Sequence, residues 1–123
     1  QFTLVDHGAG KSYLGFILYD LFVKQHQSGH VVGIETRAEL VERSKELAQQ
    51  LHFDRMAFHH LSVEESMTSN LLPEQVEIVT ALHACNTATD DAIRFGLQKQ
   101  AKFMVLVPCC QAEVAEVTEP QAI

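Results

Sequence analysis

Proline, cysteine and basic residues are all scarce in this sequence. It has 3 prolines and 46% hydrophobic residues among 123, which argues against a disordered chain and allows one domain with an apolar core. Its 3 cysteines, two of them adjacent at Cys109 and Cys110, do not form the framework of a disulfide-stabilised domain. This cysteine usage favours a reducing, cytoplasmic location.

Positive charge and long apolar runs are also lacking. With 9 basic and 16 acidic residues the net charge is -7, so the chain as a whole does not attract nucleic acid. Contact with RNA would need a flanking region or a local patch. The sequence has no apolar run of about 18 residues, the length needed to span a membrane. Because it starts and ends close to strand-like segments, we expect residues 1–123 to be part of a longer protein.

The glycine-containing segment VDHGAGKS contains the letters GKS but is not a phosphate-binding loop. Such a loop requires a glycine five positions before Gly10, and Val5 stands there, in an apolar run. The dinucleotide pattern G-x-G-x-x-G starts correctly at Gly8 and Gly10 but has Tyr13 in place of the third glycine. Neither of the common phosphate-binding patterns is therefore complete.

The charge in front of these glycines points to a different cofactor. The carboxylate of Asp6 would repel the pyrophosphate of NAD or the phosphates of ATP. S-adenosylmethionine carries a sulfonium and an ammonium group and no phosphate, so it is not repelled in this way. An acid directly before a glycine turn therefore favours S-adenosylmethionine.

Apolar runs alternate with segments of helical pattern along the chain. The expected strands are residues 2–5, 31–34, 56–61, 76–82 and 103–107, and the expected helices lie within residues 12–22, 37–51, 64–72 and 90–100. Strands separated by helix-length segments are joined by parallel crossovers. We predict a Rossmann-like, doubly wound parallel α/β sheet that is truncated after about five strands. Ligands of such sheets bind beyond the carboxyl ends of the strands.

Two further strand ends carry candidate binding residues. Glu35 ends the second strand, 25 residues after Gly10, where its carboxylate can accept hydrogen bonds from both hydroxyls of an adenosine ribose. The alternative is that Glu35 faces solvent. Ser62 and Val63 follow the third strand, in the place expected for an adenine ring. Ser62 also forms a capping-box pattern with Glu65, and both roles are compatible.

The ends of the fourth and fifth strands carry His83, Cys85, Cys109 and Cys110. Together they could form a tetrahedral metal site, but no C-x-x-C pair supports one, and we expect no metal. In a catalytic interpretation, His83 carries a proton or one cysteine acts as a nucleophile. The cysteines are equally well explained as small buried hydrophobic residues.

The segments VDHGAGKSYLGFILYDLF, VVGIE, TALHACNTATDDAI and VLVPCCQ together resemble class I S-adenosylmethionine-dependent methyltransferases. The LHACxxATD and PCC motifs are similar to one branch of this family, which includes the methyltransferase domain of the glutathione S-transferase C-terminal domain-containing protein. More distantly, the segments are similar to tRNA ribose methyltransferases. The resemblance spans nearly the whole chain.

The resemblance implies a role for each candidate residue. Asp6, Gly8, Ala9 and Gly10 would hold the methionine end of the cofactor, Glu35 the ribose, Ser62 and Val63 the adenine, and Leu82 with the rest of its strand end would face the transferable methyl. Ser12 stands where many methyltransferases have a third glycine. The Asn/Asp-Pro-Pro-aromatic signature of amino methyltransferases is absent, which disfavours an exocyclic amine as acceptor.

We therefore expect an S-adenosylmethionine-dependent methyltransferase whose acceptor the sequence does not identify, with RNA, contacted through a flanking region, as the candidate. The alternative from another class is a non-catalytic cofactor-binding or scaffold module of the same fold. Such a module would retain Asp6 and Glu35 but would need neither His83 nor the cysteines. An NAD-dependent oxidoreductase is disfavoured by Asp6 and Tyr13.

Overall fold

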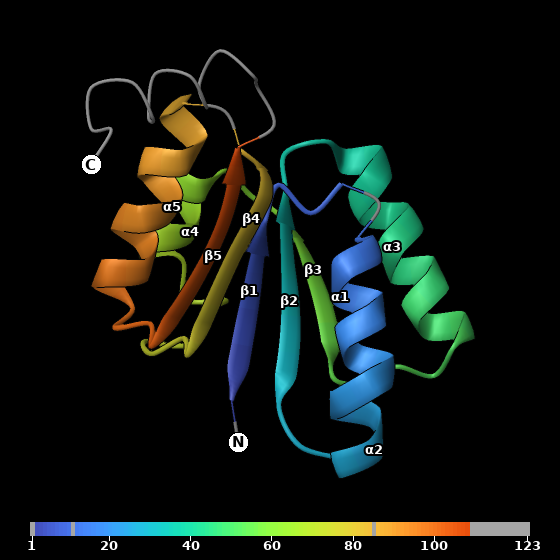
Figure 1. Cartoon of the computed structure of the whole chain (residues 1–123). Helices are drawn as coiled ribbons and strands as arrows, with labels where there is room; N and C mark the ends of the chain where they lie inside the picture. The colour runs from blue at the N-terminus through green and yellow to red at the C-terminus, as the bar shows by residue number, and fades with distance from the viewer. Residues whose placement is uncertain (1, 11, 85, 109–123) are drawn as a thin grey trace.

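Five parallel strands form the centre of the molecule (Figure 1). The computed structural model describes residues 2–10, 12–84 and 86–108, without the side chains of residues 83, 84, 86–89 and 108. The strands are β1 (Thr3–His7), β2 (His30–Glu35), β3 (Met56–His60), β4 (Ile78–Ala84) and β5 (Phe103–Pro108), and their order in the sheet is β3-β2-β1-β4-β5. This arrangement confirms the predicted doubly wound α/β sheet.

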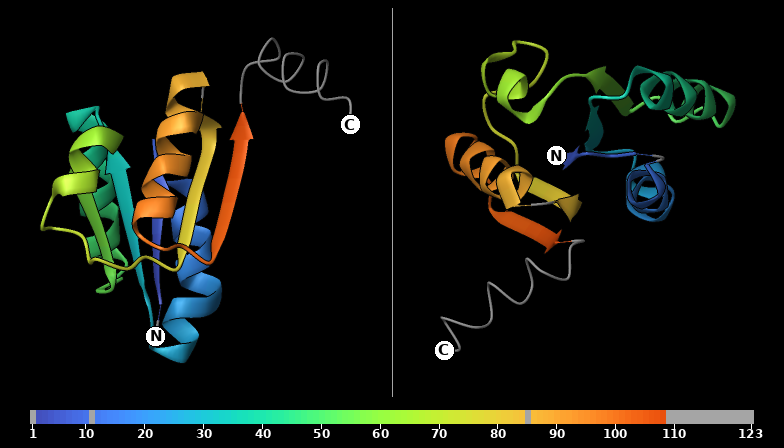
Figure 2. Two further views of the ribbon diagram at one scale, coloured as in Figure 1. Left: turned by 90° about the vertical axis from the view of Figure 1, so that its left-hand side faces the viewer. Right: turned by 90° about the horizontal axis from the view of Figure 1, so that it is seen from above.

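Helices cover both faces of the sheet, as the view from above in Figure 2 shows. One face carries α1 (Tyr13–Leu18), which continues through the π-helical segment η1 (Tyr19–Val23) into α2 (Lys24–His26), together with α3 (Ala38–Gln50). The other face carries α4 (Val63–Thr68) and α5 (Asn86–Gln98). The chain changes face between β3 and β4, so β1, which pairs with both β2 and β4, lies at the switch point of the topology.

Each face of the sheet has its own apolar core. Helix α3 buries Val41, Ser44 and Ala48, which are spaced three and four residues apart and so share one side of the helix. The core beneath α1 and α3 comprises Leu4, Tyr19, Val23, Val31, Val41, Ala48, Phe53 and Phe58. The core beneath α4 and α5 comprises Val5, Val32, Ile34, Leu72, Val76, Val79 and Phe95. Alternate residues of β1 and β2 thus serve opposite cores.

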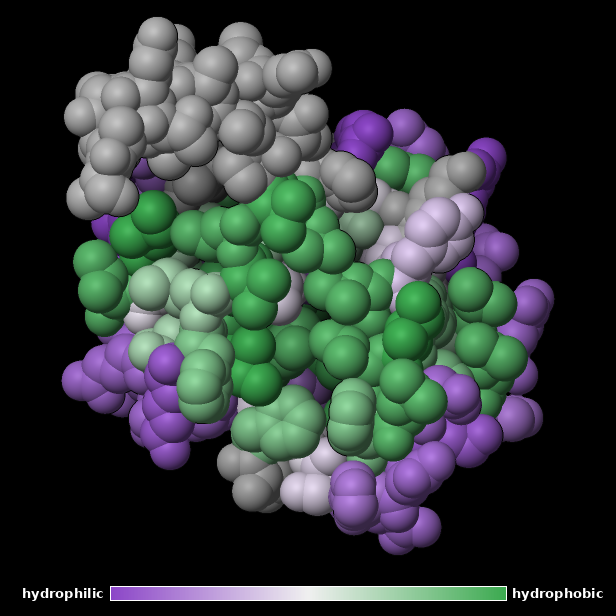
Figure 3. Space-filling view, in the orientation of Figure 1, coloured by the Kyte–Doolittle hydropathy of each residue, from purple (hydrophilic) through white to green (hydrophobic). Residues whose placement is uncertain are grey.

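An apolar groove lies beside α1, on the face of β4 and β5 opposite α5, where no described helix covers these two strands. Hydrophobic residues gather over this part of the surface in Figure 3. The groove has a volume of about 600 Å³ and is lined by Phe2, Leu4, Leu14, Leu18, Phe22, Val23, His26, Ser28, Val31, Ile78, Thr80, Leu82 and Val105. Exposed apolar side chains on its rim include Phe22 and Val105, which are 52% and 48% exposed.

Several predicted boundaries differ from the structure. The predicted strand 76–82 begins later, at Ile78, and extends to Ala84. The helix expected from residue 90 begins at Asn86, because Asn and Thr, which the sequence pattern associates with loops, are also favoured at helix starts. The helix expected to end at residue 22 continues to His26. In the described part of the chain, no helix has the length and apolar character needed to cross a bilayer.

Candidate functional site

The turn after β1 is held in a left-handed backbone conformation. Gly8 and Gly10 have φ angles of +63° and +57°, a region that favours glycine. The amide of Ala9 donates a hydrogen bond of 3.1 Å to the carbonyl of Ile34, which ties the turn to the end of β2. The glycines predicted from the sequence therefore lie beside the carboxyl end of the neighbouring strand.

Ser12 stands in the place of the third glycine and has the left-handed backbone conformation that glycine favours. It has a φ of +64° and is buried. Its hydroxyl lies 3.1 Å from the hydroxyl of Ser44 on α3, within hydrogen-bonding distance. Its amide donates to the carbonyl of Ala9 at 2.7 Å. The departure from the glycine pattern therefore leaves the turn folded, and it adds a polar contact to α3.

The side chain of Asp6 lines a cavity next to the glycine turn and accepts a hydrogen bond from a residue of the neighbouring strand. The hydroxyl of Thr80 donates a hydrogen bond of 2.8 Å to Oδ1 of Asp6, and both residues are buried. The two residues are register partners of β1 and β4. Thr80 was not predicted as a site residue, and its one signal in the sequence is a hydroxyl within the otherwise apolar run of residues 78–82.

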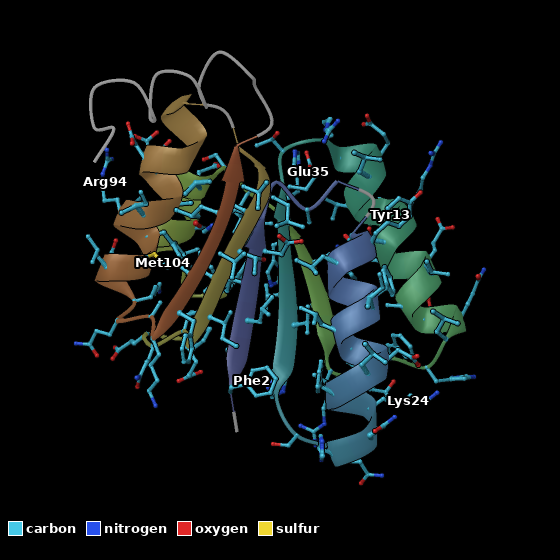
Figure 4. The ribbon with its side chains drawn as sticks, viewed as in Figure 1. Phe2, Tyr13, Lys24, Glu35, Arg94 and Met104 are labelled. Atoms are coloured by element: carbon cyan, nitrogen blue, oxygen red, sulfur yellow. The ribbon has the colours of Figure 1, made fainter. Side chains whose placement is uncertain are left out.

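Glu35 lies at the end of β2 (Figure 4), and its buried carboxylate accepts hydrogen bonds on both oxygens. Its Oε1 accepts from the amide of Gly10 at 2.9 Å and from Nη2 of Arg37 at 3.2 Å. Its Oε2 accepts from the amide and the Nε of Arg37, each at 2.9 Å. Burial raises the pKa of Glu35, but the hydrogen bonds from Arg37 and Gly10 and the charge of Arg37 outweigh it and lower the pKa to about 2. Glu35 is thus ionised and does not face solvent.

A cavity of about 320 Å³ brings part of the predicted site together. Its lining residues are Asp6, Gly8, Ala9, Gly10, Ser12, Tyr13, Leu14, Arg37 and Leu82. Five of the eight predicted cofactor-binding residues are among them. Glu35 is not, whereas Arg37, whose side chain is bonded to the Glu35 carboxylate, lines the cavity. Ser12, Tyr13, Leu14 and Arg37 were not predicted, although the first three directly follow the glycine turn in the sequence.

Ser62 and Val63 lie outside this cavity. The hydroxyl of Ser62 accepts from the amide of Glu65 at 3.0 Å, while the Glu65 carboxylate accepts from the amide of Ser62 at 2.8 Å. This reciprocal pair is the capping box expected from the sequence. Val63 packs against the core beneath α4 and α5. The adenine role of both residues stays a prediction.

The four candidate catalytic residues are not described at the level of their side chains. Cys85, Cys109 and Cys110 lie outside the described residues, and only the backbone of His83 is described, within β4. Among the described residues, no group of three His, Cys, Asp or Glu side chains could hold a metal ion. Neither the catalytic nor the metal interpretation of these four residues is thereby tested.

His7, between Asp6 and the glycine turn, has an unusual environment. Its ring packs edge-on against Phe95 of α5, with ring centroids 4.4 Å apart. It is buried, and neither ring nitrogen has a hydrogen-bond partner in the described part of the structure. Burial lowers the pKa of His7 to about 4, so the imidazole is neutral near pH 7.

A parallel sheet with a glycine turn after β1 and an acid at the end of β2 defines a Rossmann-like cofactor-binding domain. Residues 1–117 match a family model described as a methyltransferase domain. The chain belongs to this methyltransferase-domain family. No curated protein sequence matches the chain.

Solved structures, among them that of a methyltransferase, share the fold. The YcgJ protein from Bacillus subtilis is 17% identical, with a TM-score of 0.61 over 80% of this chain and 39% of its own. Geranyl diphosphate C-methyltransferase from Streptomyces coelicolor, in complex with Mg²⁺, geranyl diphosphate and S-adenosyl-L-homocysteine, is 15% identical, with a TM-score of 0.65 over 85% of this chain and 36% of its own. The chain thus spans less than half the length of either structure.

Proposed function

We propose that the protein binds S-adenosylmethionine and transfers its methyl group to an acceptor. The observation that carries this proposal is the cavity in which Asp6, Gly8 and Gly10 meet beside Glu35, within a chain of the methyltransferase-domain family. The buried carboxylate of Asp6 lines the cavity and suits a cofactor that carries positive charge, whereas the charge of Glu35 is compensated by Arg37. The S-adenosyl-L-homocysteine in the geranyl diphosphate C-methyltransferase structure supports this choice of cofactor.

The residues of the cavity fit such a cofactor. Its volume of about 320 Å³ is within the range of ligand pockets. Gly8 and Gly10, which have no side chains, allow a ligand to approach the backbone of the turn. Asp6, fixed by Thr80, would orient the methionine end, and Glu35 would accept the two ribose hydroxyls. When bound, the cofactor supplies an electrophilic methyl on its sulfonium, and the contribution of the protein is to position it.

Several finer assignments belong to the same proposal. We infer that residues 1–123 are the cofactor-binding core of a longer cytoplasmic protein, in the branch with the LHACxxATD and PCC motifs. The proposed acceptor is RNA, held by a flanking region because the net charge of this chain is -7. His83, Cys85, Cys109 and Cys110 are the candidate groups on the acceptor side.

Isothermal titration calorimetry with S-adenosylhomocysteine, NAD and ATP tests the choice of cofactor. We expect S-adenosylhomocysteine to bind and the two phosphate-containing cofactors not to bind, because Asp6 repels phosphate. Preferential binding of NAD would contradict the proposal. A transfer assay with radiolabelled S-adenosylmethionine and total RNA then tests catalysis in the full-length protein. Binding without transfer would favour a non-catalytic cofactor-binding module.

The substitution Glu35→Gln tests the ribose contact. It retains the size of the side chain but replaces one acceptor oxygen by an amide group, so one hydroxyl loses its partner. We expect the affinity for S-adenosylhomocysteine to fall by about 1.5–3 kcal/mol, the range for hydrogen bonds to charged groups. Glu46→Gln, which changes an exposed carboxylate of α3, is the matched control. Equal affinities of the Glu35 variant and the unsubstituted protein would exclude Glu35 from the ribose site.

A further inference from the structure

The side chain of Arg37 covers the carboxylate of Glu35 on its cavity side. Glu35 is 5% exposed and does not line the cavity, whereas Arg37 lines it and its side chain is 60% exposed. Nη2 of Arg37 lies 3.8 Å from the point where a Cβ on Gly10 would stand, so the guanidinium extends over the glycine turn. A ligand in this cavity meets Arg37 before it can reach Glu35.

The hydrogen bonds of Glu35 leave no acceptor site for a ligand. A carboxylate has about four lone-pair sites, two on each oxygen. The amides of Gly10 and Arg37 take one site on Oε1 and one on Oε2. The Nη2 and Nε of the Arg37 guanidinium take the second site on each. Two vicinal hydroxyls of a ribose need one free site on each oxygen, and these are the two sites that the guanidinium occupies.

We propose that the Arg37 side chain occupies the ribose subsite of the cofactor-free protein and that the cofactor displaces it on binding. This inference rests on the proposed cofactor. When the guanidinium leaves, one lone-pair site is freed on each carboxylate oxygen, and the two hydroxyls take them. The backbone amides of Gly10 and Arg37 keep their own bonds, so the carboxylate stays oriented while its partner changes.

Arg37 is able to move because it is held by one partner. Within the described structure, the hydrogen bonds of its side chain go to Glu35, and most of that side chain is in solvent. Glu35 is buried, but the guanidinium is largely in solvent and is rehydrated when the ion pair breaks, and the two ribose hydroxyls replace its hydrogen bonds to the carboxylate. Breaking the ion pair therefore reduces the affinity for the cofactor only modestly. Arg37 therefore competes with the cofactor for the carboxylate of Glu35 and lowers the affinity of the protein for the cofactor.

The substitution Arg37→Ala, measured by calorimetry with S-adenosylhomocysteine, tests this competition. We expect the variant to bind about two- to fivefold more tightly than the unsubstituted protein, because the energy of a partly exposed ion pair is no longer lost on binding. Arg43→Ala removes an exposed arginine of α3 outside the cavity and should leave the affinity unchanged. Arg37→Lys keeps the charge but cannot bond both oxygens with a planar edge, so we expect an intermediate affinity.

The Nε–H proton signal of Arg37 in NMR reports the displacement directly and is identified by its loss in Arg37→Ala. We expect slow exchange with water in the free protein and fast exchange at saturating S-adenosylhomocysteine. Weaker binding by Arg37→Ala, or an unchanged Nε–H signal on saturation, would overturn the inference while the cofactor proposal stands. If the ligand binds neither the unsubstituted protein nor the variant, the proposed function fails, and this inference fails with it.

Discussion

Asp6 and His7 are adjacent in β1, yet their side chains face opposite layers, as successive residues of a strand must. Asp6 is bonded to Thr80 and lines the cavity. His7 packs against Phe95 on the other face with both ring nitrogens unbonded in the described structure. A buried polar group without a partner lowers stability, because it gives up hydrogen bonds to water. We therefore expect protonation of His7 at acidic pH to destabilise the fold.

We expect the stability of the protein to fall with pH between about 6.5 and 4. The pKa of His7 is 6.5 in its unshifted state and about 4 in the folded protein, so the unfolded chain binds more protons in this window. The free energy of unfolding should be unaffected by this group above pH 6.5 and should decrease by up to about 3 kcal/mol toward pH 4.

Urea denaturation at several pH values measures this loss. His7→Phe should remove most of the pH dependence between pH 6.5 and 4, because it replaces the ring by one that cannot be protonated. His26→Phe changes an exposed histidine and should leave the dependence in place. An identical pH profile for His7→Phe and the unsubstituted protein would mean that other groups cause the acid sensitivity.

At the scale of single residues, spacing along the sequence predicted much of the cavity and not all of it. Asp6, Gly8 and Gly10 lie there because they follow β1 directly, and the end of a parallel strand is a predictable place. Arg37 and Thr80 could not be predicted. The position of Arg37 depends on its long side chain folding back onto Glu35. The position of Thr80 beside Asp6 depends on the register of β1 against β4, which no hydrophobic periodicity encodes.

At the scale of elements, π-helical segment η1 had no signal in the sequence. It buries Tyr19, whose hydroxyl accepts from the amide of Arg55 at 2.9 Å and whose ring stacks on Phe53 at 4.3 Å. Such a segment changes the helical turn locally and has no hydrophobic period of its own. Helix α4, in contrast, starts where its capping box predicts, because that signal is local.

The capping box also makes the role of Ser62 testable. Ser62→Ala removes the acceptor for the Glu65 amide, and we expect it to lower the free energy of unfolding by about 1 kcal/mol. Ser62→Asn retains a capping side chain and should keep most of that stability. Thermal unfolding and calorimetry with S-adenosylhomocysteine are measured on both variants. A stable Ser62→Asn protein with reduced affinity would support an adenine contact, and one with unchanged affinity would restrict Ser62 to capping.

At the scale of the whole molecule, the cavity lies at the switch point that a doubly wound sheet predicts, beyond β1 and between β2 and β4. The topology followed from the alternation of apolar runs with helix-length segments, so it was readable from the sequence. The apolar groove could not be predicted from the sequence, because the exposure of a strand depends on which part of each sheet face is covered by a helix. Leu14 and Leu82 line both the cavity and the groove, so the two lie next to each other.

The groove should govern how the 123-residue chain behaves in solution. Apolar patches exposed on a soluble protein often mark interaction or association surfaces, and this groove has exposed rim residues on two elements, Phe22 of η1 and Val105 of β5. We expect the chain to bind an apolar fluorescent dye and to self-associate at increasing concentration. The double substitution Phe22→Glu and Val105→Glu should reduce both, because a charge on each rim opposes burial of the groove.

Dye fluorescence and sedimentation velocity measure the two effects together. Leu97→Glu is the control, since Leu97 is an apolar residue of α5 that is 69% exposed and lies outside the groove. We expect this change to leave dye binding and self-association nearly as they are. An equal decrease for Leu97→Glu would place the associating surface on the α5 face. If the unsubstituted chain does not bind the dye, the groove is covered in solution rather than exposed as in this structure.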